Sequence, residues 1–219
     1  MLSILGIVNL EKERGENLLS KVTMILRGYS YEEVACVAEV LLESKYVKNM
    51  EITLNSQDPY TIIKRISQKF GDQLTIGAGT VQTYEELVKA IDAGAKFVLS
   101  PRMMSEEMLE YCKKNSVISV PGSFTPSEIA QSFAWGADIV KVFPANEVSY
   151  SYAKKVIEPM GAMNLMAVGG ITKDNVLEAL SSGYNFVGTA GGLFKKEDIK
   201  GLRKEKLLQS LKSFEAALE

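Results

Sequence analysis

Three observations on the 219-residue sequence predict an α/β protein of the (β/α)8 barrel class, the TIM barrel. Eight short apolar runs recur along the chain, amphipathic helical patterns lie between them, and the runs are spaced roughly 20 to 27 residues apart. This spacing leaves room for one strand, one helix and tight loops in each repeat. Eight such repeats favour a closed barrel over an open Rossmann-like or flavodoxin-like sheet, which would have fewer strands and usually a glycine-rich turn after the first.

Each apolar run is predicted to be a strand, and each amphipathic stretch a helix. The expected strands are 22–26, 49–54, 74–78, 96–100, 117–120, 138–143, 164–168 and 185–189. The expected helices are 31–44, 59–70, 83–93, 105–115, 125–135, 150–160, 172–182 and about 203–217. We expect a single domain over 1–219, with residues 1–20 forming an extra N-terminal helical segment.

The composition fits a globular cytoplasmic protein. Hydrophobic residues make up 46% of the chain and charged residues 24%, and the formal net charge is −2, so we expect neither a nucleic-acid nor a membrane partner. The opening MLSILGI has no basic segment before it, which argues against a signal peptide. Cys36 and Cys112 both lie in predicted helices, where we expect reduced, buried thiols.

The sequence contains no histidine. This absence excludes a Ser-His-Asp triad and the usual histidine-containing zinc sites, and two cysteines are too few for an all-cysteine site. Any acid or base must therefore be Glu, Asp, Lys, Tyr or Cys. We expect no cofactor.

A lysine interrupts the sixth predicted strand, DIVKVF. Strand alternation places Lys141 and Phe143 on the barrel interior, and on the second strand it places Glu51 and Asn55 inside. The alternatives are a structural Lys–Glu ion pair, or a surface lysine if the register is off by one residue. A lysine whose pKa is lowered by an apolar pocket is a nucleophile that forms a Schiff base with a carbonyl, and Glu51 is then the candidate proton shuttle.

Glycine-rich segments end the seventh and eighth strands, where many barrels of this class bind phosphate. Tight turns are the simpler explanation for each of them. The candidate phosphate-binding residues are Gly169, Gly170, Gly188, Thr189, Ala190 and Gly191. At other strand ends, Thr80 is a candidate donor, and Arg27 and Arg102 are candidate partners of an anionic substrate group.

Seven segments together resemble the 2-keto-3-deoxy-6-phosphogluconate / 4-hydroxy-2-oxoglutarate aldolase family: ILRG, EITLNS, GAGTV, AGAKFVLSP, PGSFTPSE, GADIVKVFPA and AVGGIT. The resemblance covers about residues 22 to 194. It implies a metal-independent class I aldolase on a (β/α)8 barrel, usually a homotrimer. It also implies that Lys141 is the Schiff-base lysine and Glu51 the general acid/base. Thr80 and Pro101 would line the pyruvate end of the site, and Phe143 would pack beside the lysine.

Several positions depart from the gluconate-type pattern. Asn55 stands where those enzymes have a carboxylate-binding arginine, and Val168 stands where they have threonine. ILRG, TLNS and the valine resemble the 2-keto-3-deoxy-6-phosphogalactonate branch, in which Arg27 would bind the carboxylate. Gly191 stands where the family has a phosphate-binding serine.

The resemblance thus implies a class I aldolase that cleaves a 2-keto-3-deoxy-6-phosphoaldonate, gluconate or galactonate type, to pyruvate and glyceraldehyde 3-phosphate. Three alternatives stay open at this point. They are an aldolase acting on unphosphorylated 4-hydroxy-2-oxoglutarate-type keto acids, a sugar-phosphate epimerase or isomerase on a related barrel, and a non-catalytic binding barrel.

Overall fold

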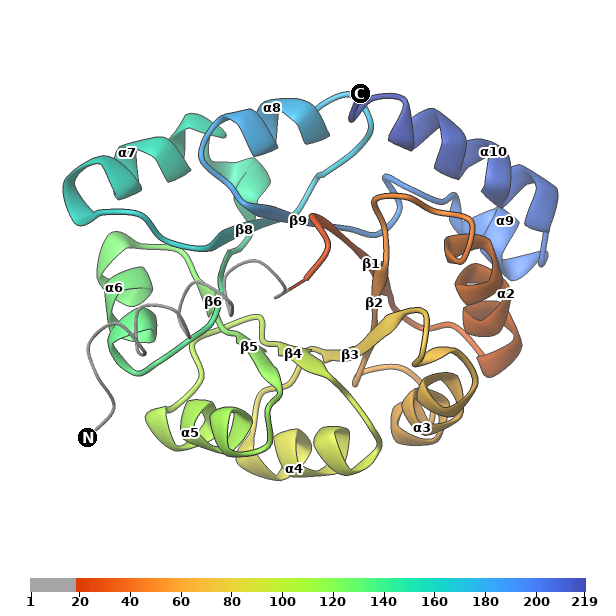
Figure 1. Cartoon of the computed structure of the whole chain (residues 1–219), viewed down its shortest axis with the longest axis horizontal. Coiled ribbons are helices and arrows are strands. Elements are labelled where there is room, and N and C mark those ends of the chain that lie inside the picture. The colour runs from red at the N-terminus through yellow and green to blue at the C-terminus, as the bar shows by residue number, and fades with distance from the viewer. Residues whose placement is uncertain (1–18) are drawn as a thin grey trace.

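Parallel strands form one sheet in the computed structural model, which describes residues 19–219 (Figure 1). The strand order in this part of the chain is β5-β4-β3-β2-β1-β9-β8-β7-β6. The strands are β1 (Val22–Leu26), β2 (Asn49–Thr53), β3 (Thr75–Gly79), β4 (Phe97–Leu99), β5 (Ile118–Val120), β6 (Gly122–Ser123), β7 (Val140–Val142), β8 (Leu165–Val168) and β9 (Phe186–Thr189).

The sheet closes into a barrel through its fifth strand, which is divided into β5 and β6 by Pro121. The backbone of Ile139 donates to the carbonyl of Ser119 at 3.2 Å, and the backbone of Lys141 donates to that of Pro121 at 2.9 Å. The division into β5 and β6 therefore interrupts neither the chain nor its pairing with the next strand. The predicted (β/α)8 class is confirmed, but the fifth strand was expected to end at 120 and instead continues to Ser123.

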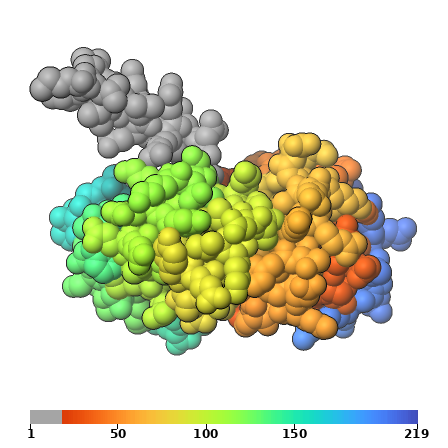
Figure 2. All heavy atoms as spheres, turned by 90° about the horizontal axis from the view of Figure 1, so that it is seen from below, coloured from red at the N-terminus to blue at the C-terminus, as the bar shows by residue number. Residues whose placement is uncertain are grey.

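Helices surround the strands on the outside of the barrel (Figure 1). Figure 2 shows one side of this shell, where α3, α4 and α5 run from orange through yellow to green. The helices are α2 (Tyr31–Leu41), α3 (Pro59–Phe70), α4 (Tyr84–Asp92), α5 (Glu106–Lys114), α6 (Pro126–Ala134), α7 (Ser151–Met160), α8 (Val176–Ser181), α9 (Lys196–Lys200) and α10 (Lys204–Glu215), with a 3₁₀ turn, η1 (Ala145–Glu147).

Strand alternation divides the buried residues between two cores, as expected for a barrel. Met50, Ile52, Val140 and Val142 belong to the outer core between strands and helices. The inner core fills the barrel itself and consists of Ile25, Phe97, Leu99, Val120, Ile139, Met166, Val168 and Phe186. The residues that alternate with Met50 and Val140, including Glu51 and Lys141, therefore belong to the interior.

The helix predictions need three corrections. The helix expected from 172 begins at Val176, because the Asn175 side chain accepts from the Thr172 backbone and donates to the Gly170 carbonyl, closing a separate turn first. The short helix α9 and the turn η1 were not predicted. The N-terminal helical segment predicted over 1–20 falls almost wholly outside the described residues. Within 19–219, no helix is both long and apolar enough to cross a membrane.

Candidate active site

Two ionisable side chains are buried in the barrel interior. Glu51 on β2 is 2% exposed and Lys141 on β7 is 6% exposed. The Lys141 ammonium lies 4.6 Å from the centroid of the Phe143 ring, which is half-buried on the same face of the chain. A charged group loses its hydration in such a place, so both side chains have a strong tendency toward their neutral forms.

The pKa values of these two groups follow from this burial. Burial raises the pKa of the Glu51 carboxyl from 4.5 to about 7, against the opposing positive charges of Lys141 and Arg27. Burial also lowers the pKa of Lys141; the Glu51 charge opposes this shift, and the Arg27 charge adds to it. The two groups are therefore close enough to affect each other's charge, and the site holds an amine and an acid that both ionise less readily than in water.

One oxygen of the Glu51 carboxyl stands out. Within the described residues, Glu51 Oε2 is buried without a hydrogen-bond partner. Leaving a buried polar atom unpaired costs about 1–3 kcal/mol. Such an atom is available to bind a substrate or a water molecule.

Gly79, the last residue of β3, provides the space for this carboxylate. A Cβ atom built at Gly79 would collide with Glu51 Oε1 and would lie 2.5 Å from its Cδ. The strand pairing places Thr53 of β2, not Glu51, opposite Gly79, so the carboxyl reaches forward along the barrel axis to fill this gap. The missing side chain at Gly79 therefore sets the position of the acid.

We expect Gly79→Ala to destabilise the fold by about 1 kcal/mol, because the new methyl group forces the carboxylate, the end of a flexible side chain, out of its place. Urea unfolding measures this change. Gly191→Ala is a matched control, because a Cβ there meets nothing within 4 Å, and we expect it to change stability by less than about 0.5 kcal/mol. Equal stabilities of the two variants would contradict the steric argument.

The candidate carboxylate-binding residues lie at the ends of the first strands. Arg27 follows β1 and is exposed, yet its charge acts on both Glu51 and Lys141. Asn55 is exposed and lines a groove of about 440 Å³ between the loops after β1 and β2. The structure therefore places Arg27 near the buried pair and Asn55 at the rim.

Thr80 and Pro101 follow β3 and β4. Thr80 is half-buried with φ of 61°, in the left-handed region that a β-branched residue rarely adopts. Pro101 is half-buried, and its carbonyl carbon would lie 2.7 Å from a Cβ at Gly122, so the loop after β4 packs closely on the divided fifth strand. Arg102 is directed elsewhere, since its Nη2 donates to the Gln82 carbonyl at 2.8 Å.

Val168, at the end of β8, belongs to the inner core and is buried. Its Cγ2 would lie 2.9 Å from a Cβ at Gly188, and Ile25 Cδ1 would lie 3.0 Å from the same atom. The interior at this level is thus apolar on the β8–β9 side and polar on the β2 side.

The candidate phosphate-binding residues come together in two loops. Thr189 is buried, and its hydroxyl donates to the Ile171 carbonyl at 2.7 Å, which joins the loop after β9 to the loop after β8. The proton of this hydroxyl is therefore already used within the protein. Gly169 and Gly170 have φ of 115° and 69°, while Gly188 is buried below them, and Ala190 and Gly191 are exposed.

Sequence reasoning missed Asn146, which lies against the two glycines. A Cβ at Gly169 would lie 2.7 Å from Asn146 Oδ1, and one at Gly170 would lie 2.8 Å from Asn146 Cβ. Asn146 belongs to the turn η1, which follows β7 after the Lys141 segment. No periodic pattern marks this residue, so only the fold brings it to the glycine loop.

Comparisons with known proteins point to one family. The family model described as "Aldolase: KDPG and KHG aldolase" matches residues 16–208. A relative from Rhizobium meliloti, a probable 2-dehydro-3-deoxy-6-phosphogalactonate aldolase, is 29% identical over 194 residues, which cover 88% of this chain and 90% of the relative.

Solved structures show the same barrel. A structure described as native KDPGal superposes with a TM-score of 0.79 at 24% identity and covers 90% of this chain and 95% of that chain. A KDPG aldolase from Legionella pneumophila, with pyruvate captured at low pH as a covalent carbinolamine intermediate, has a TM-score of 0.76 at 25% identity. The match to it covers 90% of this chain and 94% of that chain.

Proposed function

Because this chain belongs to the KDPG and KHG aldolase family, and is therefore a carbon–carbon lyase with a keto acid substrate, we propose that it works through a Schiff base on Lys141. The observation that carries the proposal is the burial of Lys141 and Glu51 in one barrel interior. Burial lowers the pKa of Lys141 and so increases the fraction of neutral, nucleophilic amine at neutral pH.

The reaction begins with addition of the neutral Lys141 amine to the keto carbon of the substrate. Glu51 in its acid form gives its proton to the departing hydroxyl, water leaves, and a protonated Schiff base remains. With a pKa of about 7, Glu51 exchanges protons in both directions near neutral pH. The covalent carbinolamine in the Legionella pneumophila relative supports this order of events.

Bond cleavage follows from the same two groups. The Glu51 carboxylate takes the proton from the hydroxyl on carbon 4, the bond between carbons 3 and 4 breaks, and its electron pair moves onto the Schiff base to form an enamine. The aldehyde departs, Glu51 returns a proton to carbon 3, and water then releases pyruvate and the free amine. The unpaired Glu51 Oε2 is the atom that we assign to these transfers.

Binding of the rest of the substrate is assigned to the loops at the barrel mouth. Arg27 and Thr80 bind the carboxylate, with Pro101 and Phe143 lining the pyruvate end. Gly169, Gly170 and residues 188–191 bind a phosphate through backbone N–H groups. Val168 offers no hydrogen bond to a substrate hydroxyl, which, with Asn55, supports the galactonate-type epimer.

A second candidate is an unphosphorylated keto acid of the 4-hydroxy-2-oxoglutarate type. The observation that favours it is the phosphate region itself, where the Thr189 hydroxyl donates to the backbone and position 191 carries no side chain. Lys173 and Lys195 line a neighbouring pocket that reaches Gly191 and Gly192, but Asp174, Glu197 and Asp198 line it too, so its charge favours neither substrate.

An aldol-cleavage assay on both phosphorylated epimers and on 4-hydroxy-2-oxoglutarate tests the proposal, together with borohydride reduction in the presence of pyruvate. We expect cleavage of a phosphorylated substrate and a fixed adduct at Lys141. Cleavage without an adduct would overturn the Schiff base on Lys141, whereas interconversion of the two epimers with neither cleavage nor an adduct would indicate an epimerase. Neither turnover nor an adduct would indicate a binding barrel.

Gly191→Ser tests the phosphate assignment. The new side chain enters open space and adds a hydroxyl beside the loops after β8 and β9. A hydrogen bond to a charged oxygen lowers the KM for the phosphorylated substrate by about tenfold. We expect no change in KM for the unphosphorylated one, and an equal change for both substrates would contradict the assignment.

A further inference from the structure

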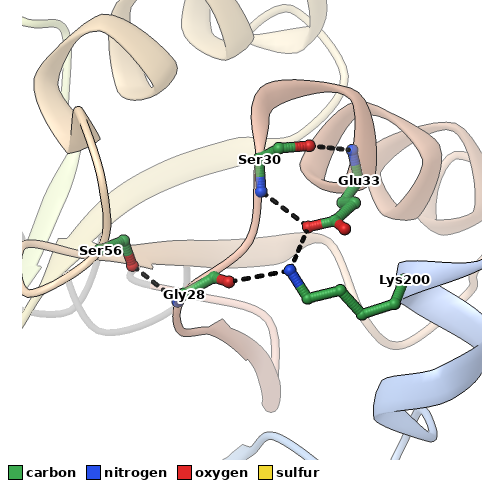
Figure 3. A network of polar contacts seen from close by, with 5 residues as sticks. All are labelled: Gly28, Ser30, Glu33, Ser56 and Lys200. Atoms are coloured by element: carbon green, nitrogen blue, oxygen red, sulfur yellow. Dashed lines mark hydrogen bonds and ion pairs between the residues drawn. The ribbon is translucent and has the colours of Figure 1, made fainter.

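The peptide after Arg27 is held by hydrogen bonds rather than by packing. Gly28 has a φ of +73°, and a Cβ built on it meets nothing within 4 Å, so the space beside its Cα is open. Its N–H donates to Ser56 Oγ at 2.8 Å, and its carbonyl accepts from Lys200 Nζ at 3.2 Å (Figure 3). Both backbone polar groups of Gly28, the residue after Arg27, are thus bound by side chains from other elements.

Lys200 makes several contacts with the segment that follows β1. Besides the Gly28 carbonyl, its ammonium lies 2.9 Å from Glu33 Oε2 and 5.3 Å from the centroid of the Tyr29 ring. The same Glu33 oxygen accepts from the Ser30 backbone at 2.7 Å, as part of the capping box of α2 (Figure 3). The Glu33 side chain is 12% exposed and that of Lys200 is 44% exposed, so the ion pair is shielded from solvent on the Glu33 side only.

Ser56 connects the same peptide to the strand that carries the acid. Ser56 Oγ lies 3.1 Å from the hydroxyl of Thr53, which is fully buried on the same face of β2 as Glu51. Asn55 immediately precedes Ser56 in the loop. A shift of Ser56 would therefore move the segment after β1 relative to both Asn55 and the barrel interior.

The strand order shows that these contacts join neighbouring parts of the barrel mouth. β1 lies between β2 and β9 in the sheet, and Lys200 ends α9, the helix after β9. The Gly28 network, defined as Gly28, Ser30, Glu33, Ser56 and Lys200, therefore joins the segments that follow three adjacent strands. The middle loop begins at Arg27, and the loop after β9 contains the proposed phosphate-binding residues.

We propose that Lys200 and Ser56 are positioning residues that hold Arg27 toward the carboxylate of the keto acid. This inference rests on the proposed function, in which Arg27 binds that carboxylate. Neither Lys200 nor Ser56 touches the reacting atoms. They act by fixing the backbone of Gly28, whose left-handed turn has open space beside its Cα.

The test is the concentration of pyruvate that half-saturates borohydride trapping at Lys141. We expect Lys200→Met to raise this concentration by about three- to tenfold, while the maximal trapping rate and kcat for cleavage stay within about twofold. Ser56→Ala gives a change in the same direction. Lys200→Arg keeps a positive donor in place and restores most of the affinity.

Lys204→Met is the matched control. Lys204 also ties a C-terminal helix to α2, through Glu39 Oε2 at 3.3 Å, and its side chain is about as exposed as that of Lys200, but it makes no hydrogen bond with Gly28. We expect wild-type affinity for pyruvate in this variant. An equal loss in Lys204→Met and Lys200→Met would reduce the role of Lys200 to general stability and overturn the proposal.

A double-mutant cycle with Arg27→Ala separates this inference from the proposed function. If Lys200 acts through Arg27, adding Lys200→Met to Arg27→Ala weakens pyruvate binding no further. Additive losses would overturn the positioning role while leaving the Schiff base intact. If wild-type protein shows neither trapping nor cleavage, the proposed function itself fails. If Arg27→Ala binds pyruvate normally, the assignment of Arg27 fails.

Discussion

Lys141→Met is expected to abolish the adduct with pyruvate and to lower kcat for aldol cleavage on the order of 10⁴-fold or more, because no other described amine is buried beside Glu51. Methionine has a similar length and fits the inner core formed around Ile139, Met166 and Phe186. The measurement is the mass of the protein after borohydride reduction with pyruvate, together with steady-state cleavage.

The stability of this variant provides a second measurement. Since the pKa of Lys141 is lowered in the fold, the unfolded chain binds the proton more tightly, and the native state becomes less stable as the pH falls below the ordinary lysine value. Methionine has no such penalty, so we expect Lys141→Met to be at least as stable as wild type at pH 7. A strongly destabilised variant would show that the amine has a structural role.

Lys48→Met is a useful control for the loss of a lysine. Lys48 is half-buried, and its Nζ donates to the Leu42 carbonyl at 2.9 Å near the start of β2, at the opposite end of the strand from the mouth. We expect this variant to form the pyruvate adduct as wild type does. Loss of the adduct in Lys48→Met would contradict the assignment of the Schiff base to Lys141.

Glu51→Gln is the second change with a large expected effect. The carboxamide has the shape of the acid but exchanges no proton, so we expect kcat to fall by about 10²–10⁴-fold. The adduct with pyruvate still forms, but more slowly, because dehydration of the carbinolamine loses its acid. Normal cleavage by Glu51→Gln would rule out Glu51 as the proton shuttle.

The pH dependence of stability follows from the raised pKa of Glu51. Between its ordinary value of 4.5 and its value of about 7 in the fold, the native state binds more protons than the unfolded chain, so stability falls as the pH rises through this window. The glutamine variant lacks this loss. We expect its free energy of unfolding, relative to wild type, to increase between pH 4.5 and 7.5 by a few kcal/mol. Urea unfolding at pH 5 and pH 8 checks it, and a constant difference would refute it.

The sequence predicted the repeating architecture well because apolar runs and strand alternation are local signals. The helix Pro59–Phe70 has the predicted bounds, and the placement of Lys141 and Glu51 in the interior follows from a period of two. The fifth strand was cut short because Pro121 ended the apolar run, although pairing with β7 continues past it. The helix α9 has only five residues, too few to show a helical period.

The supporting contacts of the site were not predictable in the same way. Lys200 and Gly28 are 172 positions apart, and no sequence pattern in either segment predicts the hydrogen bond between them. Asn146 reaches Gly169 only because η1 folds over the end of β8. Residue types thus identify the candidate catalytic groups. The residues that hold those groups in position become apparent only when the closed barrel brings distant segments together.

Because Gly79 has no side chain, its position limits how the sequence can vary among members of the family. Alanine at 79 would require the acid at 51 to adopt another side-chain conformation, whereas a lineage that has lost this acid meets no such requirement. A homologue with a bulkier residue at the equivalent of Gly79 is therefore expected either to hold this acid in a different position or to lack it.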